Sequence, residues 1–303
     1  MYPSMLVPLD GSEFSEDALP LARHLASRLG AHMHLVHVIR PAPDAELKSP
    51  QADMEWKAKV RDGAQDYLQE IADGMAEDGI ETTISILDGR VTNVLDEYAR
   101  ESGIPLVVMT THGSGGLKRW WLGSVADGLL RKGGTNVLLV RPWDDTEEGS
   151  GQERRFQHII VPLDGSTEAE TALGPARELA QLFEAEATLL RVVPAPVELT
   201  SIYGVAGVRM EGEGHRGRRE EAENYLEEVV NRGGDPVPTA QVVEAKGAAD
   251  GVIDAARKLE GDLLVLSSHG RGGLSRVVLG SVADKIIRGT TLPVLVIRPP
   301  EES

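Results

Sequence analysis

Two glycine-rich stretches carry the residues of this sequence that are best suited to chemistry. Residues 111–124 read THGSGGLKRWWLGS, and residues 268–281 read SHGRGGLSRVVLGS. In each stretch a glycine is followed, after nine residues, by a Gly-Ser pair: Gly113 with Gly123 and Ser124, and Gly270 with Gly280 and Ser281. Glycine lets the backbone approach a ligand closely, and the free N–H groups at a helix start bind phosphate. The spacing predicts a phosphate-binding loop that occurs twice, against the alternative that each loop is only a tight turn.

Each loop is matched by an identical PLDGS segment, at residues 8–12 and 162–166, that ends a short apolar run. In open α/β sheets, ligands bind outside the carboxyl ends of the strands, where the strand order reverses. Asp10 and Asp164 stand at such strand ends. An aspartate before Gly-Ser can also serve only in an Asx turn, but its place at the strand end favours contact with a ligand.

The two loops differ in charge. Arg271 stands where the first loop has Ser114, whereas Lys118 of the first loop stands where the second has Ser275. We therefore expect two non-equivalent phosphate sites. Ser124 is expected to act as the N-cap of the helix that follows the first loop, since serine is favoured at that position.

Three histidines in the segment AHMHLVH raise the question of a metal site. Strand alternation puts His32 and His34 on one face and His37 on the other. The aligned residues of the second half are Glu186, Thr188 and Arg191. Because the pattern is not repeated, we predict no metal site from side-chain clusters.

His112 and His269 open the two glycine loops. No serine or cysteine nucleophile and no paired carboxylate stands at a recognisable spacing from either histidine, as nucleophilic or acid–base catalysis would require. We assign both a structural role at the turn and predict no catalytic residue.

The sequence segments that must form the elements around these loops occur twice in the chain. Residues 5–41 align without a gap with 159–195, and the chain from 106 to 142 aligns with 263 to 299. The polar segment 144–156, DDTEEGSGQERRF, separates the halves, so we predict domains over 1–143 and 157–303 joined by that linker.

Within each half, short apolar runs alternate with helical periodicity. Runs such as LVVM and LLVL are apolar on both faces, as in parallel strands covered by helices on both sides. Residues 18, 21, 22, 25 and 29 form one apolar helix face. Further helices are expected at about 56–77, 91–101, 124–132 and 220–231, and the charged, glycine-rich stretch 199–219 is expected to be a loop. The fold class is α/β, with a doubly wound parallel sheet in each half.

Composition limits the possible functions. The 303 residues include no cysteine, which excludes disulfides and thiolate chemistry, and 48 acidic against 31 basic residues give a net charge of −17. Such a charge opposes binding to nucleic acid or anionic membranes. No secretory segment and no apolar run of membrane-spanning length is evident, so we expect a cytoplasmic protein with neither nucleic acid nor membrane as a partner.

Over nearly its whole length the chain resembles a tandem pair of universal stress protein domains. The ATP-binding members of that family carry G-x2-G-x9-G-[ST], which both loops match except at the first glycine, replaced here by Thr110 and Ser267. The resemblance implies an adenine-nucleotide alpha-hydrolase-like, Rossmann-like fold and a stress-response sensor or regulator that binds ATP, with or without Mg²⁺.

The resemblance also implies where ATP would lie. Asp10 and Asp164 would contact the adenosine, Val38 and Val192 would offer backbone groups to the adenine, and the loops would hold the phosphates. The residues that the resemblance implies in the first site are Pro8, Leu9, Asp10, Val38, Met109, Thr110, Gly113, Ser114, Gly123, Ser124 and Val125, and those in the second are Pro162, Leu163, Asp164, Val192, Leu266, Ser267, Gly270, Arg271, Gly280, Ser281 and Val282.

Two alternatives stay open at this point. One is a slow ATPase or nucleotidyl-transferring enzyme, although hydrolysis needs a positioned water or base and the sequence shows no clear base. The other is a protein that binds no nucleotide and acts only by association. This alternative stays open because Thr110 and Ser267 replace the first glycine of the ATP-binding motif. The Walker A pattern and the Rossmann G-x-G-x2-G after the first strand are both absent.

The last strand of each half, NVLLVRP at 136–142 and PVLVIRP at 293–299, is apolar and is expected at a sheet edge. An unpaired apolar edge invites association. The two edge strands can pair with each other, so we expect the halves to form an intrachain pseudo-dimer through these strands. The resemblance also implies this pairing. Whole chains can pair further into a homodimer.

Overall fold

The computed structural model describes residues 2–40, 50–111, 122–132, 134–141, 156–196, 198–199, 208–209, 213–270 and 279–299. The chain divides into two compact units. Unit 1 includes Met1–Arg155 and, from the end of the chain, Pro293–Arg298. Unit 2 includes Phe156–Leu274 and Leu279–Leu292.

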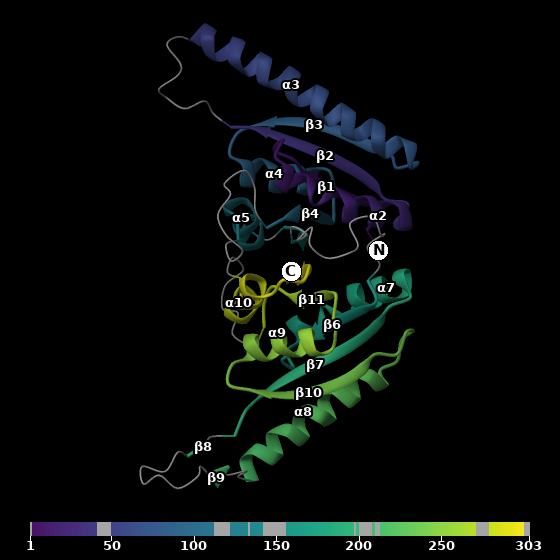
Figure 1. The fold of residues 1–303 in the computed structure, drawn as a ribbon, viewed down its shortest axis with the longest axis vertical. Coiled ribbons are helices and arrows are strands. Elements are labelled where there is room, and N and C mark those ends of the chain that lie inside the picture. Colours follow the sequence, from purple (N-terminus) through teal and green to yellow (C-terminus); the bar gives the residue numbers. More distant parts are fainter. Residues whose placement is uncertain are drawn as a thin grey trace. The chain divides into compact units, whose positions relative to one another are not determined.

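The sheet of unit 1 has the strand order β12-β5-β4-β1-β2-β3, of which Figure 1 labels β4, β1, β2 and β3. Its strands are β1 (Ser4–Pro8), β2 (His32–Ile39), β3 (Thr82–Asp88), β4 (Leu106–Thr110), β5 (Asn136–Val140) and β12 (Val294–Ile297). All neighbouring pairs are parallel except β12 with β5. After β1 the chain continues to β2 on one side of the sheet, whereas after β4 it continues to β5 on the other side. The direction in which strands are added therefore reverses between β1 and β4.

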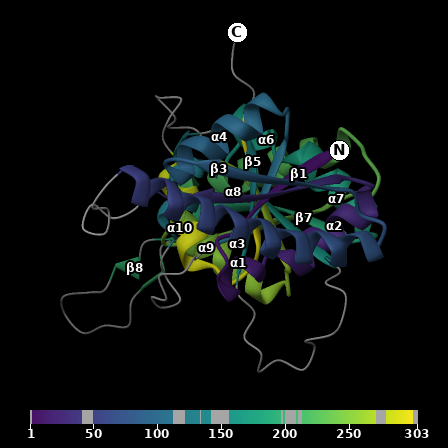
Figure 2. The same ribbon diagram turned by 90° about the horizontal axis from the view of Figure 1, so that it is seen from above.

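Helices cover both faces of this sheet. They are α1 (Glu13–Glu16), α2 (Leu19–Leu29), α3 (Pro50–Glu77), α4 (Val91–Glu101) and α5 (Ser124–Lys132). Both α3 and α4 pack on β2 and β3, and Figure 2 shows α3 and α4 on opposite sides of β3. The predicted apolar face of α2 is buried at Ala18, Leu21, Ala22 and Leu25, and β4 is buried along its whole length, as expected of a central parallel strand.

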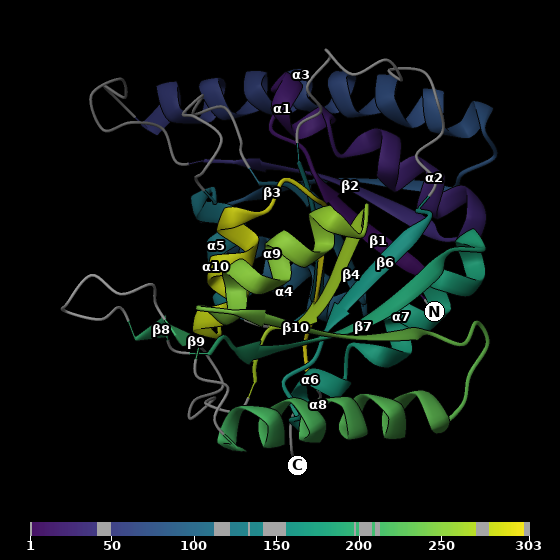
Figure 3. The ribbon, with the colours of Figure 1, turned by 60° about the horizontal axis from the view of Figure 1, so that its bottom comes forward.

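Unit 2 repeats the arrangement with the order β10-β7-β6-β11, all parallel. Its elements are β6 (His158–Pro162), α6 (Thr167–Glu170), α7 (Leu173–Phe183), β7 (Glu186–Pro194), β8 (Glu198–Leu199), β9 (Val208–Arg209), α8 (Glu213–Asn231), β10 (Thr239–Ala245), α9 (Ala248–Lys258), β11 (Leu263–Ser267) and α10 (Ser281–Gly289). Figure 3 shows α8 and α9 on opposite faces of β7 and β10. The predicted α/β class with a doubly wound sheet in each half is confirmed.

Two expectations need correction. The stretch 199–219 is not one loop, because β8 and β9 pair antiparallel and α8 begins at Glu213. The early turns of α8 are too polar to show an apolar period, but they are held by the burial of His215 and by the i,i+4 ion pair of Arg219 with Glu223. Phe156, expected to end the linker, is instead 2% exposed and packs edge-on against Phe183.

The pairing of the two last strands is confirmed. β12 runs antiparallel to β5 with Leu295 opposite Leu138, so the apolar edge of β5 is covered by a strand from the end of the chain. Among the helices of the described segments, none combines the length and the apolar character needed to cross a lipid bilayer.

Candidate functional site

The Asp-Gly-Ser turns at the ends of β1 and β6 have the same geometry. Oδ1 of Asp10 accepts hydrogen bonds from the backbone N–H of Ser12 at 3.1 Å and from its hydroxyl at 2.5 Å. Oδ1 of Asp164 accepts the same two bonds from Ser166, at 2.9 and 2.5 Å. The glycine in each turn is left-handed, with φ of 80° and 83°. The Asx turn that the sequence allows is therefore present twice, and it fixes each carboxylate at the carboxyl end of its strand.

Gly270 lies directly against the carboxylate of Asp164. A Cβ on Gly270 would be 2.6 Å from Oδ2 of Asp164, far inside normal contact. The two residues meet because β6 and β11 are adjacent parallel strands, so their carboxyl ends lie at one edge of the sheet. Any larger residue here would force the Asp164 carboxylate to move, so glycine suits this close approach.

The helix after the second loop begins at the same edge. The backbone N–H of Gly280 donates to the carbonyl of Ser268 at 2.8 Å, which holds the start of α10 beside the end of β11. Gly280 is the N-cap, and no side chain caps the helix. Ser281 is therefore the first helical residue. The first-turn N–H groups of α10 are left without a side-chain cap, the arrangement that anions use at helix starts.

The first domain repeats this connection. The N–H of Gly123 donates to the carbonyl of Thr111 at 2.6 Å, and the N–H of Asp127 donates to the carbonyl of Gly123 at 2.9 Å. α5 begins at Ser124, so the serine predicted to be the N-cap is already helical, as in α10. Both halves thus set a helix start beside the carboxyl end of the strand before the glycine loop.

Thr110 and Ser267, which replace the first glycine of the motif, are buried, with 5% and 7% of their surface exposed. The hydroxyl of Ser267 accepts a hydrogen bond from the backbone N–H of His269 at 3.3 Å. His269 in turn shares a 2.8 Å hydrogen bond between Nδ1 and the hydroxyl of Ser268. These side chains are therefore engaged within the turn, which fits the structural role assigned to His269.

The remaining predicted residues that the structure describes fall at the same strand ends and helix starts. Leu9 and Leu163 are buried, and their N–H groups donate to the carbonyls of Val36 and Leu190. Pro8, Pro162, Met109 and Leu266 lie in the last two residues of their strands, Val38 and Val192 lie near the carboxyl ends of β2 and β7, and Val125 and Val282 lie in the first turns of α5 and α10. Gly113, Ser114, Lys118, Arg271, Ser275 and His112 lie outside the described residues.

Sequence reasoning missed two pairs that hold the long helices to this edge. The hydroxyl of Tyr67 in α3 donates to Glu16, and that of Tyr225 in α8 donates to Glu170, both at 3.0 Å. Burial, and then the bonded carboxylate, raises the pKa of each tyrosine. The two tyrosine–glutamate pairs stand at equivalent positions of the two halves, and this repetition is the signal from which they could have been predicted.

A second missed pattern is an acidic residue at the end of each outer strand. Asp88 of β3 pairs with Arg61 of α3, and Glu244 of β10 pairs with Arg219 of α8 at 3.3 Å. Glu244 also accepts from Nε2 of His215 at 3.1 Å. These ion pairs tie α3 and α8 to the strands β3 and β10 near the carboxyl ends of those strands.

The histidines of β2 lie as alternation predicts. The rings of His32 and His34 are in edge contact, 4.9 Å apart. His34 bonds the hydroxyl of Tyr98 at 3.0 Å, whereas His37 bonds the carbonyl of Leu9 at 2.9 Å. Burial, and then repulsion from His32, lowers the pKa of His34. Within the described parts of the chain, no group of three or more potential ligands could hold a metal ion.

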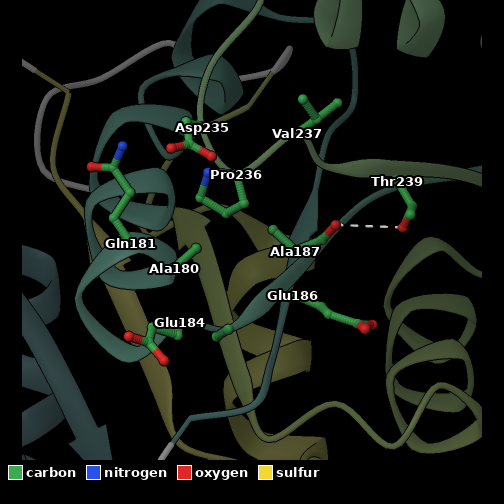
Figure 4. A pocket seen from close by; sticks show the side chains of 10 residues that line it. Ala180, Gln181, Glu184, Glu186, Ala187, Asp235, Pro236, Val237 and Thr239 are labelled. Atoms are coloured by element: carbon green, nitrogen blue, oxygen red, sulfur yellow. Dashed lines mark hydrogen bonds between the residues drawn. The ribbon is translucent and has the colours of Figure 1, made fainter.

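A hollow of about 760 Å³ in unit 2 lies elsewhere, between the end of α7 and the amino ends of β7 and β10 (Figure 4). Its charged lining residues, Glu184, Glu186 and Asp235, are all acidic. The hydroxyl of Thr239 at its wall donates to the carbonyl of Ala187 at 3.4 Å. No residue predicted for the ligand lines this hollow, and an acidic wall is unsuited to phosphate.

Comparison with known proteins shows which protein family this sequence matches. A model of the universal stress protein family matches residues 1–141 and 155–298. A universal stress protein of Mycolicibacterium smegmatis is 27% identical over 302 residues, which cover 97% of each chain. The universal stress protein YxiE of Bacillus subtilis is 30% identical over 148 residues, covering 46% of this chain and all of that protein.

A crystal structure of a universal stress protein from Archaeoglobus fulgidus superposes with a TM-score of 0.71. It covers 98% of this chain and 99% of its own, at 19% sequence identity. This likeness shows the fold of the chain.

Proposed function

The chain belongs to the universal stress protein family, and from that premise we propose that each of its domains binds ATP, with or without Mg²⁺, at the carboxyl end of its sheet. The chain would act in the cytoplasm as a stress-response sensor or regulator, with its nucleotide as the signal rather than as a fuel for strong catalysis.

One observation carries the proposal: in unit 2, Asp164, Gly270 and the uncapped start of α10 meet at one sheet edge. Asp164 would accept from a ribose hydroxyl, since an ionised carboxylate is a pure acceptor. The backbone at Gly270 and Gly280 lacks the side chains that would fill the path of the phosphates. A Cβ on Gly280 would itself lie 3.3 Å from the carbonyl of Ser268.

The phosphates would be held by backbone dipoles more than by side-chain charge. The start of an α-helix carries a partial positive charge and free N–H donors. This explains how a chain with a net charge of −17 can bind a polyanion, because the favourable groups lie within hydrogen-bonding distance and the repulsion is screened by salt.

The proposal is tested first by denaturing the purified protein and identifying released nucleotide by mass. Calorimetry with ATP should then show binding that is lost in the double variant Gly123→Val, Gly280→Val, because a branched side chain stands where phosphate must approach the backbone. The thermal transition of the variant is the control for folding. Unchanged ATP affinity in a folded double variant would contradict the assignment, and a phosphate-release assay on the same samples tests the slow ATPase.

A further inference from the structure

His215 is a buried histidine in the long helix α8 of unit 2. It lies in the first turn of α8, and only 6% of its surface is exposed. Its partner Glu244 stands opposite Val193 in the β10–β7 ladder. The neighbouring pair of that ladder contains Val192, the residue from which the adenine would take its backbone contact.

The hydrogen bonds of His215 fix which ring nitrogen carries the proton. Oε1 of Glu244 is 3.1 Å from Nε2 of His215 and 3.3 Å from Nη1 of Arg219. An ionised carboxylate can only accept, so Nε2 must carry the hydrogen. In the neutral ring, Nδ1 is then a lone-pair acceptor.

Nδ1 of His215 is buried, and among the described residues it has no hydrogen-bond partner. Most buried polar atoms in proteins are paired, and the exceptions call for an explanation. A donor brought by a ligand would complete the bonding of this ring.

We propose that Nδ1 of His215 accepts a hydrogen bond from the exocyclic amino group of adenine, and that this makes the second domain selective for adenine over guanine nucleotides. The inference rests on the proposed function. Adenine presents an amino donor at the position where guanine presents a carbonyl acceptor. Two acceptors would face each other with guanine, and sites built on a buried hydrogen bond reject ligands that cannot make it.

The first domain offers a matched contrast. Arg61 and Asp88 hold the places of Arg219 and Glu244, and four residues before Arg61 stands Lys57 where the second domain has His215. A lysine ammonium is only a donor. The first domain therefore has no equivalent acceptor at this position and should not share the selectivity.

The test uses the full chain carrying Gly123→Val, which blocks the first loop, and titrates it with ATP and with GTP by calorimetry. His215→Gln is then added, because its amide nitrogen can still donate to Glu244 but no acceptor remains at the Nδ1 position. ATP affinity should fall about tenfold, the loss of one buried hydrogen bond, while GTP affinity stays the same. As the control, Lys57→Gln in a Gly280→Val chain should leave the ATP-to-GTP ratio of the first site unchanged.

A second measurement leaves the residue intact. In the ¹⁵N-histidine-labelled chain, the Nδ1 resonance of His215, assigned by its loss in His215→Gln, should shift on adding ATP and not on adding GTP. ATP binding with an unchanged ATP-to-GTP ratio in the variant, or an unmoved resonance, overturns the inference alone. A parent chain that binds no ATP overturns the proposed function and this inference with it.

Discussion

The missing side chain of Gly270 is the smallest feature on which ligand binding should depend. In Gly270→Ala the new Cβ would lie 2.6 Å from Oδ2 of Asp164, so the carboxylate must turn away. Turning breaks the two hydrogen bonds from Ser166 that fix its direction. We expect ATP affinity at the second site to fall about tenfold, the equivalent of one well-made hydrogen bond, with the first site unaffected. Two-site calorimetric titration measures this.

Gly217→Ala in α8 is the matched control, because a Cβ there meets nothing within 4 Å. It should leave ATP binding unchanged and raise stability slightly, since alanine is favoured over glycine in a helix by about 1 kcal/mol. Equal ATP affinities in the two alanine variants would show that the approach of Gly270 to Asp164 is irrelevant to binding.

At the residue scale the sequence predicted which residues gather at the sheet edge but not how they touch. Asp164 and Gly270 could both be assigned to strand ends from local pattern. Their contact depends on the adjacency of β6 and β11, which no local pattern contains. His215 was missed for a related reason, because it lies in a polar stretch and its burial comes only from packing of α8 on the sheet.

The packing of β2 against α4 makes the stability of unit 1 depend on pH. Burial, and then the adjacent ring of His32, lowers the pKa of His34 below its ordinary value of 6.5. The unfolded chain therefore binds a proton at His34 more readily than the folded chain does, and stability is lost as pH falls below about 6.5 toward the lowered value. His34→Gln removes this proton uptake, so its melting temperature should fall less than that of the parent between pH 7.5 and 5.

His32→Gln tests the cause. It leaves His34 buried but removes the neighbouring imidazole, so it should reduce the pH dependence only in part, since repulsion from His32 is the smaller of the two causes. Thermal melts over the pH series, followed by circular dichroism, compare the three proteins. Identical pH dependence in the parent and in His34→Gln would remove His34 as the origin.

Among the elements, those with a clear period were predicted best. The ranges 91–101 and 124–132 coincide with α4 and α5, because each has an apolar face and a nearby glycine or polar break. α8 begins seven residues before the expected start at 220, where the polar sequence hides the helix. The short helices α1 and α6 were not predicted, because a single helical turn is too short to show a hydrophobic period. They are held by the caps of Ser12 and Ser166.

For the whole molecule, the end of the chain completes the sheet of unit 1. β5 has β4 on one side and β12 on the other. Arg298, just after β12, donates its backbone N–H to Asn136 at 2.9 Å and its guanidinium to the carbonyl of Leu129 at 3.4 Å. Burial lowers the pKa of Arg298 to about 10, against a partial offset from Asp96. A first domain produced alone would lack all of these contacts and leave the apolar edge of β5 open.

Separate fragments of 1–143 and 150–303 test this directly, the second beginning before Phe156 because that residue belongs to the core of unit 2. Fragment 1–143 alone should self-associate through β5, and the mixture should form a one-to-one complex, measured by size-exclusion chromatography with light scattering. Leu295→Lys in the second fragment should abolish the complex, since Leu295 is 1% exposed and stands opposite Leu138. Val237→Lys, at a site 67% exposed, should not. Monomeric fragments that ignore each other, or a complex that tolerates Leu295→Lys, would show that β12 does not hold the first domain's edge.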